Sequence, residues 1–254
     1  MGKIIAVVNQ KGGVGKTTTV INLAAGLVEQ DKKVLIVDID PQGNASSGCG
    51  ILREDKNNTI YDILVNDMNI KDIIKKAKNE DIYIIPSDQD LSGSEVELVD
   101  RKQREFILRK QLEIVCDDYD YILIDCPPAV NILTINALTA ANSVLIPMQC
   151  EYYALEGLSQ LVQTVGLVKK NTNNKLLLEG ILFTMYDGRT NLSAQVVKEV
   201  EEHFSSIVYK TKITRSVRLS EAPSFGMSCI AYDSRCKGSQ QYRELAKEFI
   251  ERNK

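Results

Sequence analysis

The sequence predicts an α/β fold, with a mostly parallel, twisted sheet and helices on both of its faces. Short apolar runs rich in β-branched residues recur along the chain, and stretches with helical periodicity lie between them. Strands that are apolar almost throughout are typical of a parallel sheet covered on both faces. With 254 residues and 44% apolar content, the chain can bury a large core. Since no change in composition marks a boundary, we expect a single domain over residues 1–254.

The elements are predicted in order along the chain. Strand candidates are the apolar segments 3–9, 33–38, 82–86, 121–125, 143–147 and 176–184. Helical periodicity covers 17–30, 101–115 and 155–170. The longest irregular segment, 41–58, follows a strand, which is where such folds place ligand-binding loops.

Composition narrows the classes of function. The net charge of −3 does not indicate a general nucleic-acid binder, so any basic surface has to be local. The six cysteines show neither a C-x-x-C pair nor metal-ligand spacing, which indicates a reduced, cytoplasmic protein with cysteines in its core. The first residues form an apolar strand rather than a signal peptide, and no apolar run is long enough to span a membrane.

The stretch NQKGGVGKTTT, residues 9–19, predicts a phosphate-binding loop. The common pattern G-x-x-x-x-G-K-[ST] requires a glycine where this chain has Gln10, and Gly12 and Gly13 supply the backbone freedom instead. The loop joins a strand to a helix, so its N–H groups and the helix dipole can face phosphate oxygens. We expect Lys16 to reach the β and γ phosphates of a nucleotide and Thr17 to bind Mg²⁺.

Two further acidic positions end predicted strands. Asp125 ends YILID, where a Walker B carboxylate would hold a Mg²⁺-bound water. Asp38 and Asp40 lie in DIDPQGN, at the end of the neighbouring strand candidate. Either position could instead hold a residue that caps a turn, but the phosphate loop favours a functional role.

Together, KGGVGKTTT, DIDPQGNAS, IDCPP, PMQCEYYALEGLSQL and RLSEAPSFG resemble the ParA/Soj family of chromosome-partitioning ATPases over essentially the whole chain. The family belongs to the deviant Walker A group of P-loop NTPases, which also contains MinD. Because the chain starts at the first strand, we expect no N-terminal DNA-binding domain of the kind found in plasmid ParA proteins.

The resemblance explains why a second lysine, Lys11, precedes Lys16. In this family the earlier lysine reaches across an ATP-sandwich homodimer to the phosphates of the other subunit, where a cation stabilises the transferring phosphoryl group. The resemblance also implies that Asp40 positions the attacking water, so Lys11, Lys16 and Asp40 form the catalytic set. It implies ATP contacts by Lys11, Gly12, Gly13, Val14, Gly15, Lys16, Thr17, Thr18, Met185, Thr214 and Ser216. Thr214 and Ser216 stand where the family usually has proline and asparagine.

A local basic stripe lies between Glu202 and Glu221, a stretch that contains no acidic residue. Composition alone favours an ordinary solvated face, whereas the resemblance implies contact with double-stranded DNA without sequence preference. The implied DNA contacts are Arg189, Arg218, Lys210, Lys212 and Arg215. The resemblance further implies a ParB/Spo0J-like activator protein and a cytoplasmic, nucleoid-associated location without membrane binding.

The sequence leaves two alternative functions open. One is a MinD-like membrane-cycling ATPase, although the last residues predict a helix that packs on the core. The other is a metabolic enzyme on the same scaffold, such as an iron–sulfur reductase or an ATP-dependent carboxylase.

Overall fold

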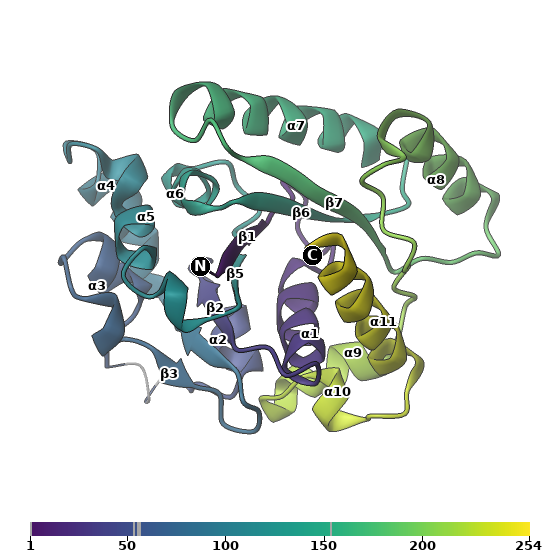
Figure 1. Cartoon of the computed structure of the whole chain (residues 1–254), viewed down its shortest axis with the longest axis horizontal. Coiled ribbons are helices and arrows are strands. Elements are labelled where there is room, and N and C mark those ends of the chain that lie inside the picture. Colours follow the sequence, from purple (N-terminus) through teal and green to yellow (C-terminus); the bar gives the residue numbers. More distant parts are fainter. Residues whose placement is uncertain (1, 53, 55–56, 153) are drawn as a thin grey trace.

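A seven-stranded sheet forms the centre of the computed structural model, which describes residues 2–52, 54, 57–152 and 154–254 (Figure 1). The strands are β1 (Lys3–Val7), β2 (Val34–Asp38), β3 (Lys75–Lys76), β4 (Tyr83–Ile85), β5 (Tyr121–Asp125), β6 (Ser143–Gln149) and β7 (Leu177–Thr184). They lie in the order β3-β4-β2-β5-β1-β6-β7. All neighbours are parallel except β3 and β4, so the predicted mostly parallel sheet is confirmed.

The helices cover both faces of the sheet, as the apolar strands predict. They are α1 (Lys16–Val28), α2 (Asn44–Gly48), α3 (Ile60–Leu64), α4 (Ser94–Glu97), α5 (Ile107–Leu112), α6 (Ile132–Ala140), α7 (Ala154–Asn171), α8 (Asn191–Phe204), α9 (Val217–Glu221), α10 (Cys229–Tyr232) and α11 (Lys237–Arg252). Short 3₁₀ turns occupy Ile70–Asp72, Gln89–Gly93, Arg104–Phe106, Cys116–Asp118 and Ala222–Phe225.

Successive residues of each central strand enter two separate cores. In β1, Ile4 and Ala6 join the core beneath α3, α5, α6, α7 and α8, whereas Ile5 and Val7 join the core beneath α1, α2, α9, α10 and α11. This alternation follows from the pleat, which points neighbouring side chains to opposite faces. Both faces are therefore fully covered.

The N-terminal and C-terminal helices lie side by side on one face (Figure 1). Gly26 of α1 allows the close approach, because a Cβ atom there would lie 2.9 Å from Cβ of Ala246 on α11. The hydroxyls of Thr19 and Tyr242 lie 3.1 Å apart across the same interface. The last forty or so residues are therefore part of the wall around the helix that follows the phosphate loop.

One predicted helix differs from the structure. The segment 101–115 forms a 3₁₀ turn and the short helix α5 rather than one continuous helix. Gln103 adopts a left-handed backbone with φ 56°, which interrupts a right-handed helix at that position. Over the described residues, no helix combines the length and apolarity that crossing a bilayer requires.

Candidate functional site

The phosphate loop is shaped by two glycines with left-handed backbones. Gly13 has φ 72° and Gly15 has φ 85°, values that residues with a side chain rarely adopt. Gly15 is also the N-cap of α1, and no side chain of the described residues caps that helix. The first N–H groups of α1 are thus available to phosphate oxygens, where the helix dipole also favours negative charge.

Two polar residues from neighbouring strands hold the loop in place. The Thr184 hydroxyl, at the end of β7, donates to the Val14 carbonyl at 2.7 Å. The Gln149 amide, at the end of β6, donates to the Gly13 carbonyl at 2.8 Å. Sequence reasoning missed both residues; the only signal was a polar side chain at the end of each apolar strand.

Lys16 is buried at the start of α1, and its amine donates to the Lys11 carbonyl at 3.2 Å. Burial lowers the pKa of this amine, although the carboxylates of Asp125 and Asp40 act in the opposite direction. A phosphate group would stabilise the charged amine further. The position therefore suits a lysine that neutralises a bound anion.

Asp125 and Thr17 form the part of the site that fits Mg²⁺. The Thr17 hydroxyl donates to one carboxylate oxygen of Asp125 at 2.7 Å. The other oxygen, Oδ1, is buried and has no hydrogen-bond partner among the described residues. A buried carboxylate oxygen without a partner is costly, and a hydrated cation satisfies it.

Asp38 and Asp125 are direct neighbours in the register of β2 and β5, and both are completely buried. Burial raises the pKa of Asp38 to about 6, against the hydrogen bonds that it accepts from Ser46. Burial and the adjacent Asp38 raise the pKa of Asp125 well above its usual range. Asp40, also buried, lies two residues further on and accepts a hydrogen bond from the Gln42 N–H at 3.0 Å. The strand ends thus gather negative charge beside Lys16, which favours binding of a divalent cation.

Lys11 differs from Lys16 in being half exposed, with 52% of its side chain accessible. It forms an ion pair with Glu151, which follows β6. Its backbone N–H donates to the Asn9 side chain at 3.0 Å. The structure therefore places Lys11 on the surface, and Lys16 in the interior, of the same loop.

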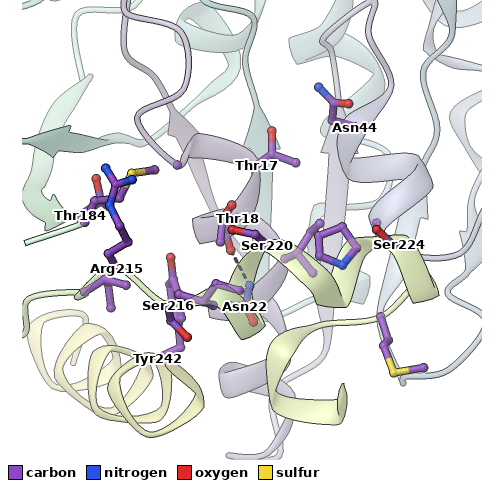
Figure 2. A pocket seen from close by; sticks show the side chains of 18 of the residues that line it. Thr17, Thr18, Asn22, Asn44, Thr184, Arg215, Ser216, Ser220, Ser224 and Tyr242 are labelled. Carbon is purple, nitrogen blue, oxygen red and sulfur yellow. Dashed lines mark hydrogen bonds between the residues drawn. The ribbon is translucent and has the colours of Figure 1, made fainter. Parts of the chain in front are cut away.

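A cavity of about 590 Å³ continues from the phosphate loop toward the C-terminal helices (Figure 2). Its lining comprises Gly15, Thr17, Thr18, Ile21, Asn22, Asn44, Ser47, Gly48, Thr184, Met185, Ile213, Thr214, Arg215, Ser216, Leu219, Ser220, Pro223, Ser224, Met227 and Tyr242. Its volume lies in the range of small-molecule and cofactor sites. The structure brings the predicted ATP contacts Met185, Thr214 and Ser216 together in this one cavity.

Two features shape the wall of this cavity around Met185 and Thr214. Met185 has a left-handed backbone with φ 49°, a strained conformation for a residue with a side chain that is often found at functional sites. Thr214 donates from both its N–H and its hydroxyl to the Gln241 side chain, at 3.0 Å each. The proline that the family usually has at this position would offer neither donor. Thr214 therefore ties the cavity wall to α11 by two hydrogen bonds that proline could not form.

Four of the five residues predicted to contact DNA have acidic neighbours. Arg189, after β7, makes a two-pronged pair with Asp187, and Arg218 on α9 pairs with Glu221 and Asp233. Lys212 lies 3.9 Å from Glu201, and the Lys210 backbone N–H donates to Glu248. Arg215 lines the nucleotide-sized cavity and extends from its wall near Thr184 (Figure 2).

The chain is similar to known proteins both in sequence and in structure. A family model described as an AAA domain matches residues 2–178. The sporulation initiation inhibitor protein Soj of Bacillus subtilis is 58% identical over 248 residues, which cover 98% of this chain and 98% of that protein. The chromosome-partitioning ATPase Soj of Treponema pallidum is 51% identical, covering 100% of this chain and 99% of that protein. Cobyrinic acid a,c-diamide synthase from Mycobacterium smegmatis, solved with a bound ATP analog and magnesium, is 35% identical, with a TM-score of 0.85 over 97% of this chain and 93% of that one.

Proposed function

Because this chain belongs to the Soj/ParA family of chromosome-partitioning ATPases, we propose that it couples ATP hydrolysis to the partitioning of DNA as an ATP-dependent homodimer. It is an ATPase, and it uses ATP with Mg²⁺. The observation that carries the proposal is the pair of lysines in one loop, with Lys16 buried and Lys11 half exposed.

The proposed catalytic roles follow from the positions of the charged groups. Lys16, the loop N–H groups and the N-terminus of α1 bind the β and γ phosphates. Thr17 would bind Mg²⁺ directly, and Asp125 would bind it through a water molecule. Mg²⁺ would neutralise charge on the β and γ phosphates. Asp40 orients the attacking water from the end of β2.

Lys11 supplies the contact that makes the dimer depend on ATP. A half-exposed cation on the rim of the loop can reach the phosphates of a second subunit, whereas the buried Lys16 serves its own subunit. Since a cation delivered in trans is worth several orders of magnitude in phosphoryl transfer, turnover would require the second copy. A ParB/Spo0J-like activator would then stimulate hydrolysis in the dimer.

The proposed DNA contacts involve phosphate groups rather than bases. Arg189 and Arg218 are both exposed, with side-chain accessibilities of 90% and 50%. Their acidic neighbours would share them with DNA phosphates, so the affinity of one monomer should be small. A dimer carries two copies of each arginine, and both halves can engage one duplex at the same time. This supports a nucleoid-associated location for the ATP form.

The test is binding to duplexes of different sequence, with and without ATP, across a series of salt concentrations. Arg189→Ala and Arg218→Ala should each weaken binding about equally for every duplex and reduce the salt dependence by roughly one charge per lost contact. The matched control is Lys169→Ala, since Lys169 is an exposed cation in the last turn of α7. The DNA role is wrong if both arginine variants bind like the control, or if the unchanged protein binds equally well without ATP.

A further inference from the structure

Two cysteines meet on the face of the sheet that α1, α10 and α11 cover. Cys229 begins α10, and Cys236 is the N-cap of α11 (Figure 1). Their sulfur atoms lie 3.3 Å apart. A disulfide requires an S–S distance of about 2.05 Å, so a small movement of one side chain would join them. Neither sulfur has a role in the nucleotide chemistry described above.

Cys236 has the environment of a reactive thiol. Its sulfur accepts the Ser239 N–H at 3.5 Å, at the N-terminus of a helix of 16 residues. Partial burial and the nearby Asp233 raise the pKa of this thiol. Hydrogen bonds with Ser239 and with the Cys229 thiol lower it by more, so the pKa lies below that of an ordinary cysteine. A lowered pKa at a helix N-terminus favours the thiolate, which is the nucleophilic form.

Cys229 has the opposite character. It is completely buried, and burial raises its pKa to about 12, although the Ser239 hydroxyl acts against this. Of the two thiols, Cys236 is therefore the one that ionises more readily. A partly exposed thiol with a lowered pKa, 3.3 Å from a buried thiol, has the arrangement of a thiol–disulfide couple.

The remaining cysteines provide an internal comparison. Cys49, Cys116 and Cys126 are buried, and burial raises the pKa of each thiol. Cys150 is partly exposed like Cys236, but burial raises its pKa to about 11. Within the described ranges, no group of three histidine, cysteine or acidic residues could hold a metal ion. The pair is thus better suited to redox chemistry than to metal binding.

We propose that Cys229 and Cys236 are a redox modification site, at which a hydroperoxide converts the two thiols reversibly into an intramolecular disulfide. The Cys236 thiolate attacks the terminal oxygen of the hydroperoxide, the O–O bond breaks, and the leaving alkoxide takes a proton. The products are a sulfenic acid on Cys236 and an alcohol. When the oxidant is hydrogen peroxide, water forms in place of the alcohol. The Cys229 sulfur then attacks the oxidised sulfur. The S–S bond forms, the S–O bond breaks, and the hydroxyl leaves as water with the proton of Cys229. A cellular dithiol would reverse the change, as expected of a transient disulfide in a reducing compartment.

The test uses the full chain treated with hydrogen peroxide under native conditions, followed by thiol blocking, tryptic digestion without reductant and mass spectrometry. Trypsin cleaves after Arg218, Arg235 and Lys237, so it separates the two cysteines. The expected product is peptide 219–235 joined to dipeptide 236–237, with the loss of two hydrogen atoms and full reversal by dithiothreitol. Cys236 should react about tenfold or more faster than Cys150, because each unit of pKa changes the thiolate fraction about tenfold.

Three variants assign the roles. Cys229→Ser should leave a sulfenic acid on Cys236 that dimedone traps, and Cys236→Ser should leave Cys229 unmodified. Cys150→Ser is the matched control and should form the disulfide at the unchanged rate. If Cys150 reacts before Cys236, or if Cys236 in the unchanged protein proceeds to sulfinic acid without the disulfide, the proposal is overturned. The mapping on the unchanged protein decides this even if a variant fails to fold.

Discussion

Asp38 and Asp125 face each other across β2 and β5, and their burial sets the charge balance of the site. Placing two carboxylates in a low-dielectric position raises the cost of ionising either one. Such strongly perturbed groups often mark functional sites. Lys16 lies beside the two carboxylates, and Oδ1 of Asp125 has no hydrogen-bond partner among the described residues. The raised pKa values therefore mark a candidate cation site.

The raised pKa of Asp38 predicts a dependence of stability on pH. Below about pH 4, Asp38 is protonated in both the folded and the unfolded chain. Between about pH 4 and 6, the unfolded chain releases this proton, whereas the folded chain keeps it. Stability is therefore lost as the pH rises through this window. The free energy of unfolding of Asp38→Asn, relative to the unchanged chain, should increase by on the order of 3 kcal/mol between about pH 4 and 7.

Urea unfolding at a series of pH values, without nucleotide or Mg²⁺, measures this difference. Any hydrogen bond to Ser46 that the substitution weakens adds a constant offset, so the change with pH is the diagnostic quantity. A difference that stays flat from about pH 4 to 7 would contradict the raised pKa.

Lys16→Ala should abolish ATP binding, because the phosphates lose the buried cation nearest to them. The affinity for ATP with Mg²⁺, measured by titration calorimetry, should fall by at least about a hundredfold, since an unpaired charge is left in a low-dielectric site. Affinity within about twofold of the unchanged protein would remove the phosphate-loop assignment.

Asp40→Ala should retain ATP binding and lose turnover, since Lys16, Thr17 and the loop N–H groups remain. Loss of a group that positions the attacking water should lower the turnover number by about 10²-fold or more. Steady-state phosphate release measures turnover, and calorimetry on the same sample supplies the control. A normal turnover number would show that another group orients the water.

At the scale of elements, the central part of the fold could be predicted from the sequence. The segments 121–125 and 143–147 read as apolar runs, and β5 and β6 begin at the predicted residues. The two-residue strand β3 could not be predicted, because it is defined by pairing with β4 rather than by any local pattern.

The candidate site could be predicted only in part, because some of its residues come together only through contacts between distant segments. A phosphate loop is local, since its glycines, lysine and threonine adjoin in sequence, so Gly12, Gly13, Lys16 and Thr17 could be predicted from spacing. The role of Lys11 could be predicted only from the family resemblance. The cavity as a whole combines side chains from α1, α2, the end of β7, the segment 213–227 and α11. Only tertiary packing brings these together, and the roles of Gln149 and Gln241 depend on contacts with residues far away in sequence.

Gly26 and Gly166 are predicted to respond in opposite ways to the same substitution. Both lie inside helices, where alanine is preferred over glycine by roughly 0.5–1 kcal/mol. At Gly26 the added Cβ would lie 2.9 Å from Ala246 and 3.1 Å from the Tyr242 carbonyl, whereas at Gly166 in α7 it meets nothing within 4 Å. Gly26→Ala should therefore destabilise the fold by about 1–2 kcal/mol, and Gly166→Ala should stabilise it by about 0.5–1 kcal/mol.

Denaturant unfolding of the two variants beside the unchanged chain measures both effects. Equal changes in the free energy of unfolding would mean that α1 and α11 are not in close contact at Gly26.

At the scale of the whole molecule, Lys11 links the nucleotide to assembly. Lys11→Ala should bind ATP but remain a monomer, because only the contact across the dimer is removed. Light scattering after size exclusion, with ATP present, measures the mass. The matched control is Glu151→Gln, which removes the ion-pair partner of Lys11 within the chain and leaves the lysine.

Glu151→Gln should dimerise at least as readily as the unchanged protein. An exposed ion pair contributes at most about 1 kcal/mol, so the dimerisation constant should change by no more than about fivefold. An ATP-dependent dimer formed by Lys11→Ala would show that Lys11 acts within its own subunit.

The strand order also determines when the protein becomes active during its own synthesis. Of the strands, β1 is made first, but it lies between β5 and β6 in the sheet, so its two neighbours are complete only once Gln149 has been made. The wall of the cavity is completed later still, when Tyr242 on α11 reaches α1. Pairings between segments so distant along the chain form slowly, because a long loop must close first. A nascent chain should therefore carry its nucleotide motif long before the pocket is complete, and we expect ATP binding only after Tyr242 has been made.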